Sequence, residues 1–163
     1  EDQKIISPSL KNFLLLILAV LFVQLVYGGF MAGLRAGITA PTWPDINGQL
    51  LPASYNELTP FTRNLVANPI MIHFIHRGTA YLLTLLIAIW WYKTRPVNSS
   101  PLFSKLRTSL MLLVLLQVLL GILTVLNATH PNRLVLLGVS HQAVAMLLLM
   151  VIVSLVFVVR KRQ

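Results

Sequence analysis

The 163-residue chain is 56% hydrophobic and only 10% charged, a composition that excludes an ordinary soluble domain with one central core. It contains no cysteine, which excludes disulfides, thiolate metal sites and cysteine nucleophiles. Four apolar stretches, at about 12–34, 69–92, 108–128 and 134–159, are long enough to cross a bilayer, because a spanning helix needs roughly 20 residues. We therefore expect an all-α integral membrane protein, with residues 1–163 forming a single four-transmembrane-helix bundle.

The formal net charge of +9 is unevenly distributed along the chain. Three arginines, Arg35, Arg63 and Arg133, lie in the connections 35–68 and 129–133. Most of the other basic residues lie at the chain ends or between residues 93 and 107: Lys4, Lys11, Lys93, Arg95, Lys105, Arg107, Arg160, Lys161 and Arg162. This is the positive-inside bias, so we expect both termini to face the cytoplasm. The charge then attracts anionic membrane lipid rather than nucleic acid.

The first predicted helix, at about 12–34, is too long for the apolar region of a signal peptide and precedes no cleavage-like site. Gly29, Gly33 and Gly37 repeat every fourth residue. Such spacing lets a neighbouring helix or a flat ligand come close, and plain helix packing explains it equally well. The chain begins at Glu1 without an initiator methionine, so we expect it to be processed or to be part of a longer chain.

The longest connection, residues 35–68, is rich in turn-forming residues and is expected on the outer side of the membrane. Trp43 and Tyr55 are typical of the interface between membrane and water. Residues at about 60–67 predict a short surface helix, in which Thr59 caps the first turn and Phe61 and Leu65 share a face.

The second and fourth predicted helices each carry a histidine near their outer start, in "NPIMIHFIHRGTAYLL" and "RLVLLGVSHQAV". His76 lies seven residues beyond Pro69 and His141 eight beyond Arg133, which places both imidazoles about 10–12 Å below the helix starts. A single membrane histidine often only hydrogen-bonds between helices. Two at one depth, on neighbouring helices, predict a metal held from opposite sides, which is the axial geometry of a haem in a four-helix bundle.

Other polar residues surround the two histidines in the sequence. We expect Arg77 to face the carboxylates of such a haem, or else to extend to the outer interface. Gln142 is expected to orient a carboxylate or a neighbouring helix. His73, one turn nearer to water, is interpreted as a supporting or surface residue, and His130 as an exposed residue of the last turn. No carboxylate lies within a predicted helix, which argues against proton pumping by an acidic relay, and the sequence leaves the catalytic residues unknown.

The two helical hairpins are faintly alike. Gln24 precedes Gly28 just as Gln117 precedes Gly121, and the second helix of each hairpin carries a histidine near its start. The repeat is too weak to support a conclusion alone.

Four segments together resemble the haem A synthase family over about residues 20–155: "GGFMAGLRAGITAPTWPDINGQLLP", "FIHRGTAYLL", "LQVLLGILTVL" and "SHQAVAMLLL". That family has two fused four-helix halves and oxidises the C8 methyl of haem O to the formyl of haem A. The resemblance implies that this chain is similar to the carboxy-terminal half, which holds a haem b. His76 and His141 would then be the axial ligands of its iron.

The chain departs from the substrate-binding half of the family in two ways. That half has a glutamate three residues before the histidine of its histidine–arginine pair, where this chain has His73, and it often carries an outer-loop cysteine pair that is absent here. The resemblance therefore implies a cofactor role for this chain, with catalysis in a substrate-binding partner half or in an assembly with a second copy. It also implies the cytoplasmic (inner) membrane of a prokaryote, with the haem near the outer face.

Two other functions fit the same residues. One is a bis-histidine b-type cytochrome subunit that only carries electrons between a quinol pool and a partner complex. The other is a haem-free membrane assembly or scaffold protein, whose histidines only join helices.

Overall fold

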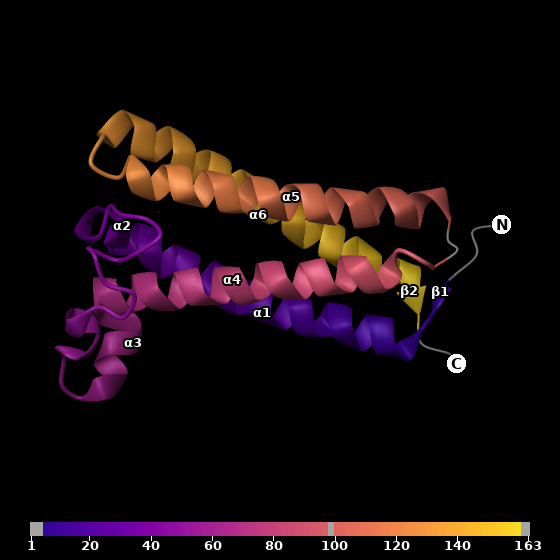
Figure 1. Ribbon diagram of the computed structural model, residues 1–163, viewed down its shortest axis with the longest axis horizontal. Helices are drawn as coiled ribbons and strands as arrows, with labels where there is room; N and C mark the ends of the chain where they lie inside the picture. The colour runs from indigo at the N-terminus through magenta and orange to yellow at the C-terminus, as the bar shows by residue number, and fades with distance from the viewer. Residues whose placement is uncertain (1–4, 98–99, 161–163) are drawn as a thin grey trace.

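Four long helices account for most of the computed structural model, which describes residues 5–97 and 100–160 (Figure 1). They are α1 (Pro8–Gly33), α4 (Pro69–Thr94), α5 (Pro101–Leu126) and α6 (Pro131–Val158). All four are long and apolar enough to cross a membrane. The predicted four-helix membrane bundle is therefore confirmed.

Each long helix begins with a proline, whose missing N–H costs nothing in the first turn. The side chains of Ser7, Asn68 and Ser100 cap three of these helices by accepting backbone N–H hydrogen bonds. Because these starts are polar, α1, α5 and α6 begin three to seven residues before the apolar stretches from which they were predicted.

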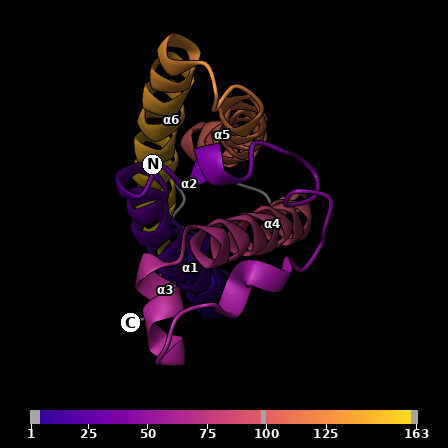
Figure 2. The same cartoon turned by 90° about the vertical axis from the view of Figure 1, so that its left-hand side faces the viewer.

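The helices form two hairpins, α1 with α4 and α5 with α6, which also contact each other through α1 with α6 and α4 with α5. The four helices therefore follow one another around a ring, as the view along the bundle shows (Figure 2). In this arrangement α4 and α6, the two helices that carry His76 and His141, lie diagonally across the bundle. The predicted metal site depended on these two helices lying near each other, which the sequence did not establish; in the structure they lie opposite each other across the bundle.

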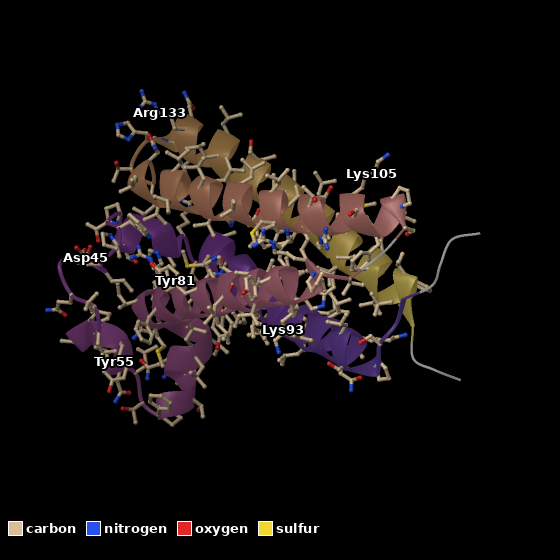
Figure 3. All side chains as sticks on the ribbon, turned by 45° about the vertical axis from the view of Figure 1, so that its right-hand side comes forward. Asp45, Tyr55, Tyr81, Lys93, Lys105 and Arg133 are labelled. Atoms are coloured by element: carbon tan, nitrogen blue, oxygen red, sulfur yellow. The ribbon has the colours of Figure 1, made fainter. Side chains whose placement is uncertain are left out.

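One end of the bundle contains both ends of the described chain together with the end of α4 and the start of α5; we call it the terminal end (Figure 1). There the two-residue strands β1 (Ile5–Ile6) and β2 (Val159–Arg160) pair in parallel, which the sequence did not predict. The other end, the loop end, carries residues 34–68 and 127–130. Asp45 and Arg133 lie at the loop end and Lys105 lies toward the terminal end (Figure 3).

The apolar core occupies the terminal half of the bundle. Trp90 is fully buried there, lies 5.9 Å from the Phe103 ring between centroids, and donates a hydrogen bond to the Leu10 carbonyl. The thirteen buried residues of this cluster are Leu14, Ile17, Leu21, Leu83, Ile87, Trp90, Phe103, Leu110, Val114, Leu148, Ile152, Leu155 and Val159. Toward the loop end, within the described residues, the last members of this cluster are Leu21 of α1, Leu83 of α4, Val114 of α5 and Leu148 of α6.

The long connection folds into short helices: α2 (Ala36–Thr39), the 3-10 helices η1 (Ala53–Asn56) and η2 (Phe61–Arg63), and α3 (Asn64–Ala67). The segment predicted as one surface helix at about 60–67 is thus η2 followed by α3. Thr59 provides no side-chain cap, so that detail was wrong. Asn64 organises this region instead, because its buried amide hydrogen-bonds the Leu58 N–H and the carbonyls of Leu58 and Phe61.

Candidate functional site

His76 of α4 lies against α1. Its Nε2 atom is 3.2 Å from Nε2 of Gln24, and its Cε1 atom lies beside Gly28, where an added Cβ would be 3.6 Å away. The Thr79 hydroxyl contacts the amide oxygen of Gln24, so this glutamine is held at both ends of its amide. The ring is therefore fixed in a notch that Gln24 and Gly28 form on the neighbouring helix.

His141 of α6 lies against α5 in the same way. Its Nε2 atom is 3.1 Å from Nε2 of Gln117, and an added Cβ at Gly121 would be 3.1 Å from its Cε1 atom. A contact of that length is tighter than most Cβ contacts, so a larger residue at position 121 would require the ring to shift by a few tenths of an ångström. Each hairpin thus holds one imidazole between a glutamine and the glycine four residues later.

The two histidines stand at equal heights above the apolar core. His76 lies seven residues before Leu83 and His141 seven before Leu148. These leucines are the core residues of α4 and α6 that lie nearest to the loop end. The counts from the helix starts differ, because α6 begins at Pro131, two residues before the start from which the depth of His141 was predicted. The two histidines therefore have equivalent positions when residues are counted from the core, but not when they are counted from the helix starts.

The glutamines obey the same register. Gln24 lies three residues beyond Leu21 and Gln117 three beyond Val114, the last core residues of α1 and α5. All four polar side chains therefore lie just beyond the edge of the core, in the loop half of the bundle. The sequence contained this signal as the repeated glutamine–glycine spacing, but it did not reveal that the repeat contacts the histidines.

Each imidazole has one free nitrogen. The Nδ1 atoms of His76 and His141 are buried and have no hydrogen-bond partner in the described part of the chain. Across residues 5–97 and 100–160, no three histidine, aspartate or glutamate side chains cluster as metal ligands. A metal at this site would thus need most of its ligands from elsewhere, which a macrocycle with two axial imidazoles provides.

Arg77 is directed toward the long connection. Its Nε donates to Nε2 of His73 at 3.0 Å, Nη1 to the carbonyls of Pro44 and Asp45, and Nη2 to the carbonyl of Thr42. These four bonds use four of the five N–H groups of a guanidinium, which leaves one on Nη2. Arg77 therefore fastens the loop to α4, one residue beyond His76.

His73 is completely buried, so the interpretation of this residue as a surface group was wrong. Its Nε2 accepts the hydrogen bond from Arg77, which requires that nitrogen to be unprotonated. The interpretation as a supporting residue remains a prediction.

The loop that Arg77 holds is itself ordered by short-range hydrogen bonds. Oδ1 of Asp45 accepts from the Gly48 N–H at 2.9 Å, and the Thr42 hydroxyl accepts from the Asn47 N–H at 2.8 Å. The bond from Gly48, with a further contribution from Thr42, holds the pKa of the Asp45 carboxyl below its ordinary value of 3.8. Its stabilisation of the turn is therefore complete above pH 3.8 and is lost as the pH falls through the lowered pKa.

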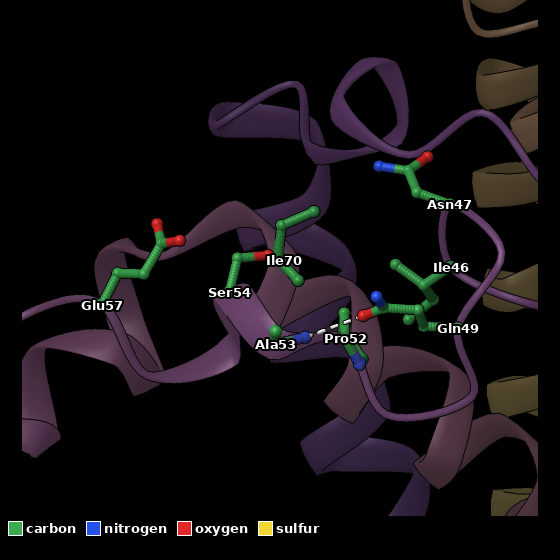
Figure 4. A pocket seen from close by; sticks show the side chains of 8 residues that line it. All are labelled: Ile46, Asn47, Gln49, Pro52, Ala53, Ser54, Glu57 and Ile70. Carbon is green, nitrogen blue, oxygen red and sulfur yellow. Dashed lines mark hydrogen bonds between the residues drawn. The ribbon is translucent and has the colours of Figure 1, made fainter.

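A shallow pocket lies beside this loop (Figure 4), and neither His76 nor His141 is among its lining residues. Gln49 accepts a hydrogen bond from the Ala53 N–H across it, and Glu57 is its only acidic lining residue. Its lining residues are Ile46, Asn47, Gln49, Pro52, Ala53, Ser54, Glu57 and Ile70. Because its one carboxylate has no basic partner among these residues, the pocket supports no chemistry of its own.

The remaining predicted residues lie on the surface. Gln142 is exposed on the outward side of α6, and His130 is exposed in the turn before that helix. Gly29 and Gly33, two members of the glycine repeat, have no neighbour within 4 Å of an added Cβ, whereas at Gly37 an added Cβ would lie 3.7 Å from Ala128. The glycines that do meet the histidines are Gly28 and Gly121.

The fold and the paired histidines together define a four-helix membrane protein with two equivalent imidazole sites. A family model described as "Cytochrome oxidase assembly protein" (COX15-CtaA) matches residues 3–153. The chain belongs to this family.

Several relatives named heme A synthase match most of the chain. The protein from Beijerinckia indica subsp. indica is 42% identical over 153 residues, which is 88% of this chain and 41% of the relative. Those from Bradyrhizobium diazoefficiens and Nitrosospira multiformis are 38% and 35% identical, over 91% and 86% of this chain and 41% and 38% of their own lengths. The chain thus spans about two fifths of the length of these relatives. No solved structure matches it.

The loop contacts of Arg77 lead to a prediction that involves no cofactor. We expect Arg77→Ala to accelerate hydrogen exchange at the Asn47 and Gly48 amides by about tenfold or more, since hydrogen bonds from a charged donor are worth roughly 1.5–3 kcal/mol. Arg77→Lys is expected to restore little of this protection, because an ammonium group lacks the planar fork. Exchange is measured by mass spectrometry in detergent or nanodiscs.

The exposed Arg133, whose side chain contacts Asn127 within its own turn, provides the control. Arg133→Ala is expected to leave exchange in the loop unchanged. Equal exchange at the Asn47 and Gly48 amides in the wild type and Arg77→Ala would show that Arg77 does not hold the loop.

Proposed function

We propose that this chain is the haem b-binding half of a haem A synthase and supports oxidation of the haem O C8 methyl to the formyl of haem A by electron transfer. One observation carries this proposal: His76 and His141 lie on diagonal helices at equal heights above the core. Membership of the family, and relatives named heme A synthase, support a role in haem A biosynthesis.

The residues present fit a haem with two axial imidazoles. Two histidines come from opposite helices, their surroundings are apolar helices, and each ring has a buried Nδ1 atom whose hydrogen-bonding demand no residue of the described chain meets. In this role His76 and His141 ligate the iron, and Gly28 and Gly121 provide the space that the ring edges need. A haem b held in this way supplies a one-electron redox centre within the membrane.

The geometry favours different roles for Arg77 and Gln142, the two other residues that were predicted to bind the cofactor. Arg77 has one N–H left for a haem carboxylate after its bonds to the loop and His73, so its proposed role combines loop closure with a single carboxylate contact. Gln142 is exposed on the outward side of α6. Of the two roles expected for it, contact with a neighbouring helix is therefore favoured over contact with a carboxylate.

Catalysis is assigned to a partner. His73 occupies the position where the resemblance places the glutamate of the substrate half, and here it is a buried acceptor for Arg77. A carboxylate that serves as base or stabilises positive charge has no equivalent in an imidazole held in this way. We infer that haem O is oxidised in a substrate-binding half of the same family or in an assembly with a second copy.

The proposed location is the cytoplasmic membrane of a prokaryote. Lys93, Arg95, Lys105 and Arg107 lie near the terminal end of the bundle, which by the positive-inside bias favours a cytoplasmic position for that end and for both termini. The loop end, with the two histidines nearer to it, then lies toward the outer face. Lys4, Lys161 and Arg162, which belong to the same charge pattern, lie outside the described residues.

The ligand assignment is tested by absorption and electron paramagnetic resonance spectra of the purified chain. The wild type is expected to show a low-spin haem with two imidazole ligands, and His76→Ala and His141→Ala are each expected to abolish this low-spin form. His130→Ala, which changes an exposed histidine, is the matched control and is expected to keep it. Unchanged spectra in both ligand variants would refute the assignment, and a wild type without haem would favour the scaffold function.

The assignment of catalysis to a partner is tested by supplying haem O and an electron donor in the presence of air, because oxidation of a methyl to a formyl group needs an oxidant. We expect mass spectrometry to detect haem A only when the chain is assembled with a glutamate-bearing substrate half, because this chain lacks the carboxylate. Haem A formed by the chain alone would contradict that assignment. No haem A in either assembly would favour the electron-carrier function.

A further inference from the structure

The side chains of His141 and Gln117 have four polar atoms between them, and only two of these atoms take part in a hydrogen bond in the described part of the chain. One bond joins Nε2 of the ring to the amide nitrogen of Gln117. Nδ1 of His141 and Oε1 of Gln117 are both buried and without partners in the described part of the chain. A neutral imidazole has one donor and one acceptor nitrogen, so the unused atoms are one donor and one acceptor, whichever way the amide is turned.

The unused atoms match each other. With Nε2 accepting from the amide, the ring proton is on Nδ1, and the amide oxygen is an acceptor within the same pair. A second arrangement of the two side chains, in which Nδ1–H donates to Oε1, would satisfy these two atoms in place of the amide N–H and Nε2, which the observed bond joins. It would also release Nε2, the nitrogen that the observed bond occupies.

The other pair lacks this freedom. Oε1 of Gln24 is in contact with the Thr79 hydroxyl, which lies three residues beyond His76. The equivalent position, three residues beyond His141, is Val144, whose side chain has no polar atom. The two sites are therefore alike in register but differ in one hydroxyl, and of these two glutamines it is Gln117 whose amide oxygen has no partner in the described part of the chain.

We propose that Gln117 is a positioning residue for His141 with two hydrogen-bonding states. In the observed state its amide N–H holds Nε2. In the second state its carbonyl oxygen accepts from Nδ1–H, and the Nε2 lone pair is free to bind iron. This inference rests on the proposed function, because it names the residue that orients one of the two proposed axial ligands.

The second state has a measurable electronic consequence. A ligating histidine that donates its other N–H to an oxygen becomes a stronger base, and loss of such a partner typically weakens metal binding by 10–100-fold. A more basic imidazole stabilises ferric over ferrous iron, so the partner also lowers the reduction potential. A residue that only packed against the ring would not change the potential in a defined direction.

The test compares Gln117→Leu with Thr124→Val in the full chain loaded with haem b. Thr124 lies on the same helix, and its hydroxyl bonds only the Leu120 carbonyl of that helix among the described residues, so Thr124→Val is a matched loss of one polar group. We expect Gln117→Leu to keep the low-spin spectrum, to bind haem about tenfold or more weakly, and to raise the reduction potential. Thr124→Val is expected to match the wild type in all three.

A second variant guards against loss of folding. Gln117→Glu keeps an oxygen acceptor but removes the amide donor, so it is expected to retain haem and to have a potential at or below that of the wild type. Gln117→Leu and Gln117→Glu potentials that do not differ from the wild type would overturn the role of Gln117. Should His141→Ala keep the low-spin spectrum, the proposed function itself fails, so the two failures are distinguishable.

Discussion

The structure depends on where its apolar core ends. The core stops at Leu21, Leu83, Val114 and Leu148, and beyond this edge the helices carry glutamine and histidine side chains. Inside a membrane there is no bulk water to satisfy such groups, so they must pair with one another or with a ligand. Each hairpin makes one such pair and leaves a ring nitrogen unpaired. These unpaired ring nitrogens are the reason why we propose that a ligand binds in the loop half of the bundle.

The loop end adds a second constraint, because Arg77 ties the long connection to α4 beside His76. Arg77 donates hydrogen bonds to the carbonyls of Thr42, Pro44 and Asp45 and to His73. These bonds connect the loop to the first turns of α4. A cofactor at the two histidines would therefore lie under a fastened loop. The same bonds require Nε2 of His73 to remain unprotonated, which links the state of a buried side chain to loop closure.

The sequence predicted the four helices and their histidines because span length and apolar content depend on local composition. The predicted starts of α1, α5 and α6 were too late, because the first turn of each helix lies outside the apolar stretch from which it was predicted. The diagonal placement of α4 and α6 could not be predicted, because it depends on how the hairpins pack. The partners of Arg77 were also inaccessible, since backbone carbonyls of a distant loop leave no pattern in the residue types. The repeat of Gln24 and Gln117 was visible in the sequence, but only the structure shows that both glutamines lie just beyond the core and contact the histidines.

The central claim is that one iron binds an imidazole from each hairpin. Pulsed electron paramagnetic resonance on the ferric, haem-loaded chain, with all histidines labelled with ¹⁵N, counts the axial histidine nitrogens directly. The account predicts hyperfine couplings from two such nitrogens, with only one remaining when either His76 or His141 is replaced. Couplings from fewer than two histidine nitrogens in the wild type would contradict it.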